Sequence, residues 1–183
     1  MVLAVALAWP LRSPRIEHHG EAREGLGLQP IVHRGTWILP RRNGELPTKP
    51  PLFHWFGAIA AKLWGLSDVT VRLPSAVAAW LVAALTFALA RATGDRRTAW
   101  MAVGVLLGMV PFLESAVEAR VDMLLAACTT GALTAFFFWY RSKSATARAL
   151  VYGAIAAGVL AKGPIGAALP VLVIVIFLTV EGD

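Results

Sequence analysis

The sequence contains a single cysteine, Cys128, and few charged residues for its length. One thiol excludes a disulfide within the chain and a zinc site built from several cysteines. Only 15% of the 183 residues are charged, whereas 57% are hydrophobic. A soluble domain of this size needs a larger polar share to cover its surface, and a chain in hydrocarbon does not. The composition therefore indicates an integral membrane protein.

Acidic residues are also scarce, since 11 of them face 17 lysines and arginines and leave a net charge of +6. In a soluble protein such an excess suggests nucleic-acid binding. Here the basic residues lie between apolar runs, where lipid headgroups, phosphates and membrane topology explain them. We therefore expect membrane lipids, and no nucleic acid, among the partners.

Several stretches without charge are long enough, or nearly long enough, to cross a bilayer. They are Leu73–Ala90, Thr98–Leu113, Met123–Tyr140, Ala149–Ala161 and Gly163–Val180. About 20 helical residues, rising about 1.5 Å each, span the hydrocarbon core. The shortest stretch is extended by Lys162, whose long side chain can reach the interface. The sequence predicts an all-α, multi-pass helix bundle with five spans within residues 70–183.

The two ends of the chain suggest a fragment. Residues 1–9 are apolar but too few for a span, and they lack the basic lead-in of a signal peptide. We expect them to be a truncated first membrane helix. The chain also stops just after an apolar run. Residues 10–69 would then form a long outer loop between this first helix and the bundle.

The charged links between the expected spans predict their orientation. Basic side chains follow the first and third spans: Arg91, Arg96, Arg97, Arg141, Lys143 and Arg148. Short basic links stay in the cytoplasm. The link with Glu114, Glu118 and Asp122, the link with Lys162, and residues 10–69 therefore face outward. We expect a multi-pass protein of the cell (inner or plasma) membrane whose active face is extracytoplasmic.

The outer loop is expected to contain two helices. Residues 21–32 mix apolar and polar side chains at helical spacing, which predicts a short surface helix. Residues 34–48 are rich in Gly, Pro, Arg and Asn and predict a loop. Residues 51–66 begin with prolines and contain Phe53, Trp55, Phe56 and Trp64, as an interfacial helix at the headgroups would. A re-entrant or buried helix is the alternative.

The outer face gathers ionisable residues, which are costly at a membrane edge and are therefore candidates for function. Its carboxylates are Glu17, Glu21, Glu24, Glu114, Glu118 and Asp122, and its cations are Arg41, Arg42, Lys49, Arg72, Arg120 and Lys162. A carboxylate could take a proton from an acceptor or hold a divalent cation. Lysine and arginine could hold a phosphate and stabilise it as a leaving group.

Each candidate also has a structural interpretation. Asp122 could simply favour the dipole at a helix N-terminus, and Lys162 could be a snorkelling lysine at a helical break. Lys49 could be a solvated loop cation. The run from Glu17 to Glu21 with His18 and His19 has metal-ligand residue types, but such short clusters are common in loops. A divalent cation is therefore left open, and no other cofactor is expected.

Five motifs, in order, carry a resemblance to a known family. They are Glu21-Ala-Arg23, Gly35-Thr-Trp37 through Asn43-Gly44, Lys49-Pro-Pro-Leu52, Glu118-Ala-Arg-Val-Asp122 and Leu160-Ala-Lys162-Gly163-Pro164. Trp64-Gly65 and Val71-Arg72-Leu-Pro74 continue the match over nearly the whole chain. In these motifs the chain resembles the protein mannosyltransferase-like superfamily, which includes the bacterial aminoarabinose transferases of lipid A.

The resemblance implies an all-helical fold of the membrane glycosyltransferase C type. It implies transfer of a sugar, typically with inversion, from a polyprenyl-phosphate donor to an extracytoplasmic lipid, glycan or protein acceptor. By motif, Glu21 and Asp122 correspond to the functional acidic pair and Lys49 to the residue near the lipid phosphate. Lys162 would be a second contact, and Arg42 and Arg72 would help to neutralise the departing phosphate.

The chain departs from this pattern at two positions. Gly20 stands where the family usually has the aspartate of an Asp-Glu pair, and Thr48 stands where relatives acting on lipid A often have glutamate. The second departure weakens both a lipid A assignment and a metal ligand there. A non-catalytic or degenerate membrane subunit is therefore the main alternative. A transporter is less well supported, because the sequence shows neither repeat symmetry nor charges near mid-membrane.

Overall fold

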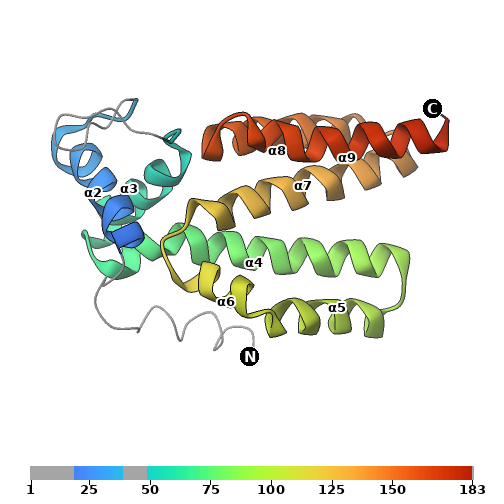
Figure 1. Ribbon diagram of the computed structural model, residues 1–183, viewed down its shortest axis with the longest axis horizontal. Helices are drawn as coiled ribbons and strands as arrows, with labels where there is room; N and C mark the ends of the chain where they lie inside the picture. Colours follow the sequence, from blue (N-terminus) through green and yellow to red (C-terminus); the bar gives the residue numbers. More distant parts are fainter. Residues whose placement is uncertain (1–18, 39–48, 183) are drawn as a thin grey trace.

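The computed structural model of this protein describes residues 19–38 and 49–182, and every regular element in these ranges is a helix. Two helices, α2 (His19–Arg34) and α3 (Leu52–Trp64), lie across one end of an elongated bundle (Figure 1). The bundle consists of α4 (Asp68–Thr93), α5 (Arg96–Gly108), α6 (Val110–Val117), α7 (Val121–Ser142), α8 (Ala145–Lys162) and α9 (Ile165–Glu181). The all-α prediction is confirmed.

Three helices, α4, α7 and α8, are long and apolar enough to cross a membrane. They cover the predicted first, third and fourth spans. Helix α9 covers most of the predicted fifth span and is apolar, but it has only 17 residues. The turns between neighbouring helices are short, so α4 and α5, α7 and α8, and α8 and α9 run antiparallel (Figure 1).

The predicted second span, Thr98–Leu113, is not one straight helix. It is divided into α5 and α6, which meet at Met109 with a bend of 73°. Met109 has an extended backbone, and Pro111 stands in the first turn of α6. A proline has no amide hydrogen, and its ring crowds the carbonyl four residues earlier, so Pro111 favours a bend or break of the helix at this point. By length and composition α5 and α6 together form either one broken span or a re-entrant loop, so a span here stays a prediction. The break itself was not predicted, because an absence of charge does not reveal a helix break.

Helices α8 and α9 approach each other at two glycines. A Cβ atom on Gly166 would lie 2.0 Å from the carbonyl carbon of Gly158, and one on Gly158 would lie 2.9 Å from the carbonyl oxygen of Gly166. These distances are shorter than any side chain tolerates. Small residues that allow close backbone approach are typical of helix contacts in membranes. The contact fixes the end of α8, where Lys162 is located.

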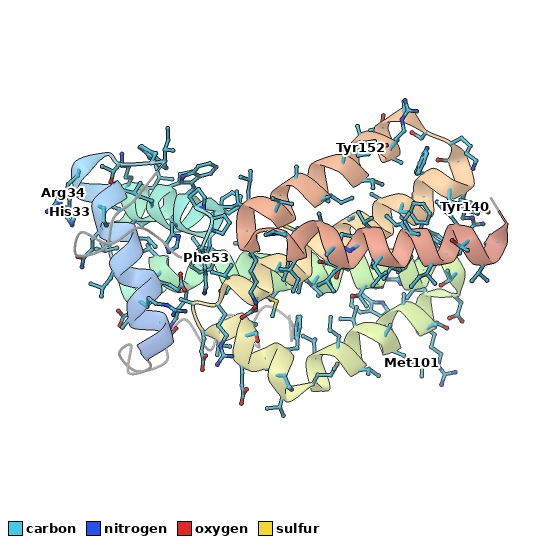
Figure 2. The ribbon with its side chains drawn as sticks, turned by 45° about the horizontal axis from the view of Figure 1, so that its top comes forward. His33, Arg34, Phe53, Met101, Tyr140 and Tyr152 are labelled. Carbon is cyan, nitrogen blue, oxygen red and sulfur yellow. The ribbon has the colours of Figure 1, made fainter. Side chains whose placement is uncertain are left out.

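Helices α2 and α3 confirm the helices predicted at residues 21–32 and 51–66. Leu28, Ile31 and Phe53 are completely buried where these helices pack together and against α4 (Figure 2 labels Phe53). The opposite face of α3 exposes Phe56, Ile59, Leu63 and Trp64. An exposed apolar face beside a membrane bundle suits the headgroup region, so an interfacial position for α3 remains our prediction. The expected helix at 1–9 and most of the loop 34–48 lie outside the described residues.

Candidate functional site

A pocket of about 390 Å³ opens where the start of α2 faces the link between α6 and α7. Its lining residues are Gly20, Glu21, Arg23, Glu24, Lys49, Glu118, Ala119, Arg120, Val121 and Asp122. Glu21, Lys49 and Asp122 are three residues that the sequence singles out. They come from α2, from the segment before α3 and from the first turn of α7. The fold thus brings them to one end of the bundle.

The Glu21 carboxylate is buried, and both of its oxygens accept hydrogen bonds. Its side chain is only 3% exposed. Arg72 of α4 donates to both carboxylate oxygens at 2.9 Å, and the backbone N–H of Ala119 donates to Oε1 at 2.8 Å. This carboxylate therefore ties α2 and α4 to the link that leads into α7. A carboxylate so fully paired is better suited to positioning Asp122 than to accepting a proton.

The link between α6 and α7 is further fixed by α4. The Ser75 hydroxyl accepts a hydrogen bond from the Arg120 backbone N–H at 2.9 Å and lies 3.2 Å from the Arg120 carbonyl oxygen, to which it donates. The side chain of Arg120 pairs with Glu118 at 2.6 Å. Because both backbone groups of Arg120 are used, the chain enters α7 in a defined direction. This direction places Asp122 at the pocket.

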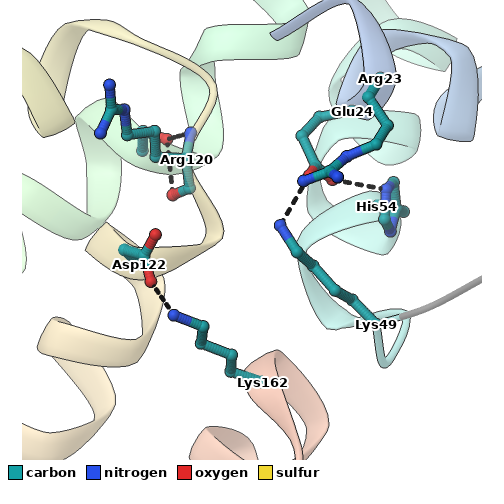
Figure 3. Close-up of polar contacts among 8 residues, drawn as sticks. Arg23, Glu24, Lys49, His54, Arg120, Asp122 and Lys162 are labelled. Atoms are coloured by element: carbon teal, nitrogen blue, oxygen red, sulfur yellow. Dashed lines mark hydrogen bonds and ion pairs between the residues drawn. The ribbon is translucent and has the colours of Figure 1, made fainter. Parts of the chain in front are cut away.

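Asp122 is the accessible carboxylate of the site. Its side chain is 55% exposed, and it forms an ion pair with Lys162 from the last turn of α8 (Figure 3). Lys162 does not line the pocket itself but reaches it through this pair. The helix ends there because Gly163 adopts a φ of 77°, which residues with a side chain rarely adopt. Asp122 and Lys162 therefore meet through the antiparallel arrangement of α7 and α8.

Glu24 lines the pocket, although the sequence motifs indicated only that it is one of the carboxylates of the outer face. Its carboxylate accepts from Lys49 Nζ at 2.8 Å and from His54 Nε2 at 3.0 Å, and Arg23 lies 3.7 Å away (Figure 3). Burial alone would raise the pKa of Glu24, but the hydrogen bonds from His54 and Lys49 and the charge of Lys49 outweigh it and lower the pKa to about 2. Glu24 is therefore ionised at neutral pH.

His54 holds Glu24 from the apolar side. Its ring is buried, and Nδ1 has no hydrogen-bond partner among the described atoms. The ring proton is therefore assigned to Nε2, which donates to Glu24. Gly27 leaves room for this ring, because a Cβ atom there would lie 2.5 Å from His54 Nε2. The sequence gives only a weak indication that Glu24 belongs to the site. Glu24 stands three residues after Glu21 and therefore lies on the same face of α2.

The remaining predicted residues are distributed as follows. Arg72 is buried behind the pocket and acts on Glu21 rather than lining the cavity. Arg42, Glu17 and His18 lie outside the described residues. Gly20 lines the pocket, and a Cβ atom there would meet nothing within 4 Å. The position where the family resemblance leads us to expect an acid is therefore open space. Within residues 19–38 and 49–182, no group of three or more His, Cys, Asp or Glu residues could hold a metal ion.

The pocket contains both a candidate proton acceptor and candidate phosphate-binding cations. Asp122 is an exposed carboxylate that could accept a proton. Lys49 and Arg23 are cations that could bind a phosphate and stabilise negative charge on it. They face the same cavity, so both could act on one bound molecule.

Residues 48–182 match the family described as dolichyl-phosphate-mannose-protein mannosyltransferase. The chain is 33% identical, over 81% of its length, to the undecaprenyl phosphate-alpha-4-amino-4-deoxy-L-arabinose arabinosyl transferase of Shewanella sediminis, and covers 28% of that protein. It is 31% identical, over 91% of its length, to the enzyme of the same name from Aeromonas hydrophila, and covers 30% of it. The chain thus spans about a third of the length of these relatives.

Crystal structures of ArnT from Cupriavidus metallidurans resemble the whole chain. The apo structure has a TM-score of 0.91 and the structure bound to undecaprenyl phosphate has a TM-score of 0.90. In both cases the sequence identity is 25%, and the match covers 100% of this chain and 35% of the other. The arrangement of helices is therefore shared over the full described region.

Proposed function

The chain belongs to the dolichyl-phosphate-mannose-protein mannosyltransferase family, and on that premise we propose that it serves to transfer a sugar from a polyprenyl-phosphate donor to an extracytoplasmic acceptor. Its fold is that of the membrane glycosyltransferase C type, as the ArnT structures share it. The observation that carries the proposal is the pocket in which an exposed carboxylate, Asp122, faces the cations Lys49 and Arg23. The related structure bound to undecaprenyl phosphate supports the class of donor lipid.

In the proposed reaction, Asp122 accepts the proton of an acceptor hydroxyl or amine as that group attacks the anomeric carbon of the sugar. The bond between this carbon and the phosphate oxygen breaks, and its electron pair leaves with the oxygen. The donor phosphodiester becomes a polyprenyl phosphate monoester. Lys49, with Arg23 beside it, stabilises the negative charge that develops on the phosphate. Attack opposite the leaving group would invert the sugar configuration.

The other predicted residues support this centre. Lys162 pairs with Asp122 and so holds this carboxylate in place at the end of α7. Glu21 and Arg72 hold the link before α7 in place through the Ala119 N–H. We assign both a positioning role. Arg42 keeps its proposed role as an additional phosphate contact, although it lies outside the described residues.

The acceptor would approach from the extracytoplasmic side of the cell membrane. The exposed apolar face of α3 lies at the same end of the bundle as the pocket and would rest among the lipid headgroups. A polyprenyl chain could then lie in the bilayer while its phosphate reaches Lys49. The names of the relatives favour an amino-sugar pentose, and a lipid, a glycan or a protein could serve as acceptor.

The experiment compares Asp122→Asn and Lys49→Ala with the parent in the complete gene product. Transfer is followed by mass spectrometry of the lipid-linked donor and the glycosylated product. We expect each variant to reduce transfer by at least about 100-fold while expression stays unchanged. Thermal stability should stay close to that of the parent in Asp122→Asn and fall in Lys49→Ala, which removes a partner of the buried Glu24 carboxylate. Normal turnover in both variants would refute the assignment of this site.

The open space at Gly20 favours one second candidate, a non-catalytic subunit that keeps the fold without the family's usual acid. The two functions differ in lipid binding. A transferase retains polyprenyl phosphate during purification in mild detergent, and a subunit with a purely structural role does not. Lipid extraction and mass spectrometry of the parent protein therefore separate them.

A further inference from the structure

The charges around the pocket are almost completely balanced. Each described acidic side chain that lines it is paired with a basic one: Glu21 with Arg72, Glu24 with Lys49, Glu118 with Arg120, and Asp122 with Lys162. Among the described lining residues, Arg23 is the basic side chain that is not needed to balance one of these four acids. With the two partners that do not line the pocket, Arg72 and Lys162, included, these nine side chains carry a net charge of one positive unit.

Glu24 is the carboxylate that keeps this net charge small where a phosphate would bind. Its Oε1 atom lies 2.8 Å from Lys49 Nζ and 3.7 Å from Arg23, so one negative charge is shared by two cations. His54 donates to the other oxygen, Oε2, and prevents the carboxylate from turning away. The Glu24 side chain is 5% exposed, so water screens its charge poorly. A phosphate between Lys49 and Arg23 would therefore feel the carboxylate strongly.

The donor and the lipid product of the proposed reaction differ in charge at this phosphate. A sugar-linked polyprenyl phosphate is a phosphodiester with a single negative charge. Loss of the sugar leaves a monoester, which carries nearly two negative charges at neutral pH because its second pKa is about 6. A site with one excess positive charge complements the diester, and the second charge of the monoester faces the Glu24 carboxylate.

We propose that Glu24 makes the pocket select a singly charged polyprenyl phosphodiester over the doubly charged polyprenyl phosphate monoester, and so helps the spent lipid to leave. The inference rests on the proposed function, since it assumes that the phosphate binds beside Lys49. It assigns Glu24 a role in specificity that its hydrogen bonds to Lys49 and His54 alone do not imply.

The test measures equilibrium binding of two probes to the protein in lipid nanodiscs at pH 7.5. The probes are undecaprenyl phosphate and its methyl ester, which share the lipid and differ by about one charge. Glu24→Gln keeps the shape of the side chain and removes its charge. We expect this variant to shift the ratio of the two affinities toward the monoester by on the order of tenfold. The control is Asp95→Asn, which removes an acidic charge at the other end of α4 and should leave the ratio unchanged.

Arg23→Gln provides a second, independent variant. The Arg23 side chain is 48% exposed, so its replacement should not disturb folding even if Glu24→Gln does. Loss of this cation should move the ratio in the opposite direction, toward the methyl ester, by a factor of several. An unchanged ratio in either folded variant overturns the inference, including the case in which both affinities fall equally, because that result indicates a structural role only. If the parent protein binds neither probe, the proposed function itself fails.

Discussion

At the scale of single residues, burial separates the two acids that the family resemblance pairs as functional. Glu21 is enclosed, with both oxygens taken by Arg72, whereas more than half of the Asp122 side chain is exposed. A proton acceptor has to reach its substrate, and a positioning residue does not. The two acids should therefore respond differently to the same change from carboxylate to amide.

Glu21→Gln should destabilise the protein by about 3 kcal/mol, because it removes the charge that receives two hydrogen bonds from the buried Arg72 guanidinium. Asp122→Asn should change stability by less than about 1 kcal/mol, because its ion pair is exposed to water. Unfolding of the two variants in the same detergent measures the difference. A Glu21→Gln variant as stable as the parent would contradict the positioning role.

The pKa of Glu24 predicts a loss of stability in acid. The pKa is lowered from 4.5 to about 2 on folding, so the ionised carboxylate stabilises the folded state fully above about pH 4.5. This contribution of about 3 kcal/mol is lost as the pH falls from 4.5 toward 2. Thermal unfolding of the parent and of Glu24→Gln over this range tests it. The difference between the thermal unfolding midpoints of the parent and of Glu24→Gln should become smaller as the pH falls. A difference that does not change with pH would be inconsistent with a lowered pKa of Glu24.

At the scale of helices, the contact between α8 and α9 depends on glycine. Gly166→Ala would place a Cβ atom within about 2 Å of the α8 backbone and force the helices apart, at a cost of about 1–3 kcal/mol. Gly153→Ala in α8 is a matched control, since its Cβ atom would meet nothing within 4 Å. This control should be neutral or slightly stabilising, because alanine favours the helix over glycine. Thermal unfolding of the two variants compares them, and equal midpoints would exclude the close approach.

The helix contact also has a functional consequence. Lys162 ends α8, four residues after Gly158, and its ammonium group pairs with Asp122 of α7. A displacement of α9 would move the end of α8 and weaken this pair. We therefore expect Gly166→Ala to lower transfer as well as stability, and Gly153→Ala to lower neither. Transfer assays on the same preparations test this expectation.

At the scale of the whole molecule, the pocket lies at one end of the bundle and the basic turn between α7 and α8 at the other. Figure 2 shows Arg34 near the first end and Tyr140 near the second. Helix α7 has 22 residues and so is about 33 Å long, enough to cross the hydrocarbon core. The two ends should therefore lie in different compartments.

Cysteine labelling in intact cells tests this orientation. In a Cys128→Ser background, Arg34→Cys should react with a membrane-impermeant maleimide added outside. Lys143→Cys, in the turn after α7, should react only after the cells are permeabilised. Reaction of both positions from the same side would refute the membrane topology, and with it an extracytoplasmic acceptor.

The sequence alone determined the class of structure. Apolar runs without charge predicted α4, α7, α8 and α9, because in hydrocarbon a single segment satisfies its own backbone hydrogen bonds only as a helix. Amphipathic spacing and aromatic content likewise predicted α2 and α3. The break at Met109 was missed although Pro111 is visible, because the length of a charge-free run says nothing about its continuity.

Only the tertiary structure decided how the charged residues are paired. Sequence motifs named Glu21, Lys49 and Asp122, but they could not show that Glu24 joins Lys49 to His54 or that Arg72 neutralises Glu21. Arg72 and Glu21 are 51 positions apart, and Asp122 and Lys162 are 40 positions apart. Hydropathy depends on each residue and its neighbours in the chain, whereas an ion pair depends on helix packing that brings distant residues within about 3 Å of each other. The composition therefore predicted the membrane bundle, and the packing determined which acid is buried and which is exposed.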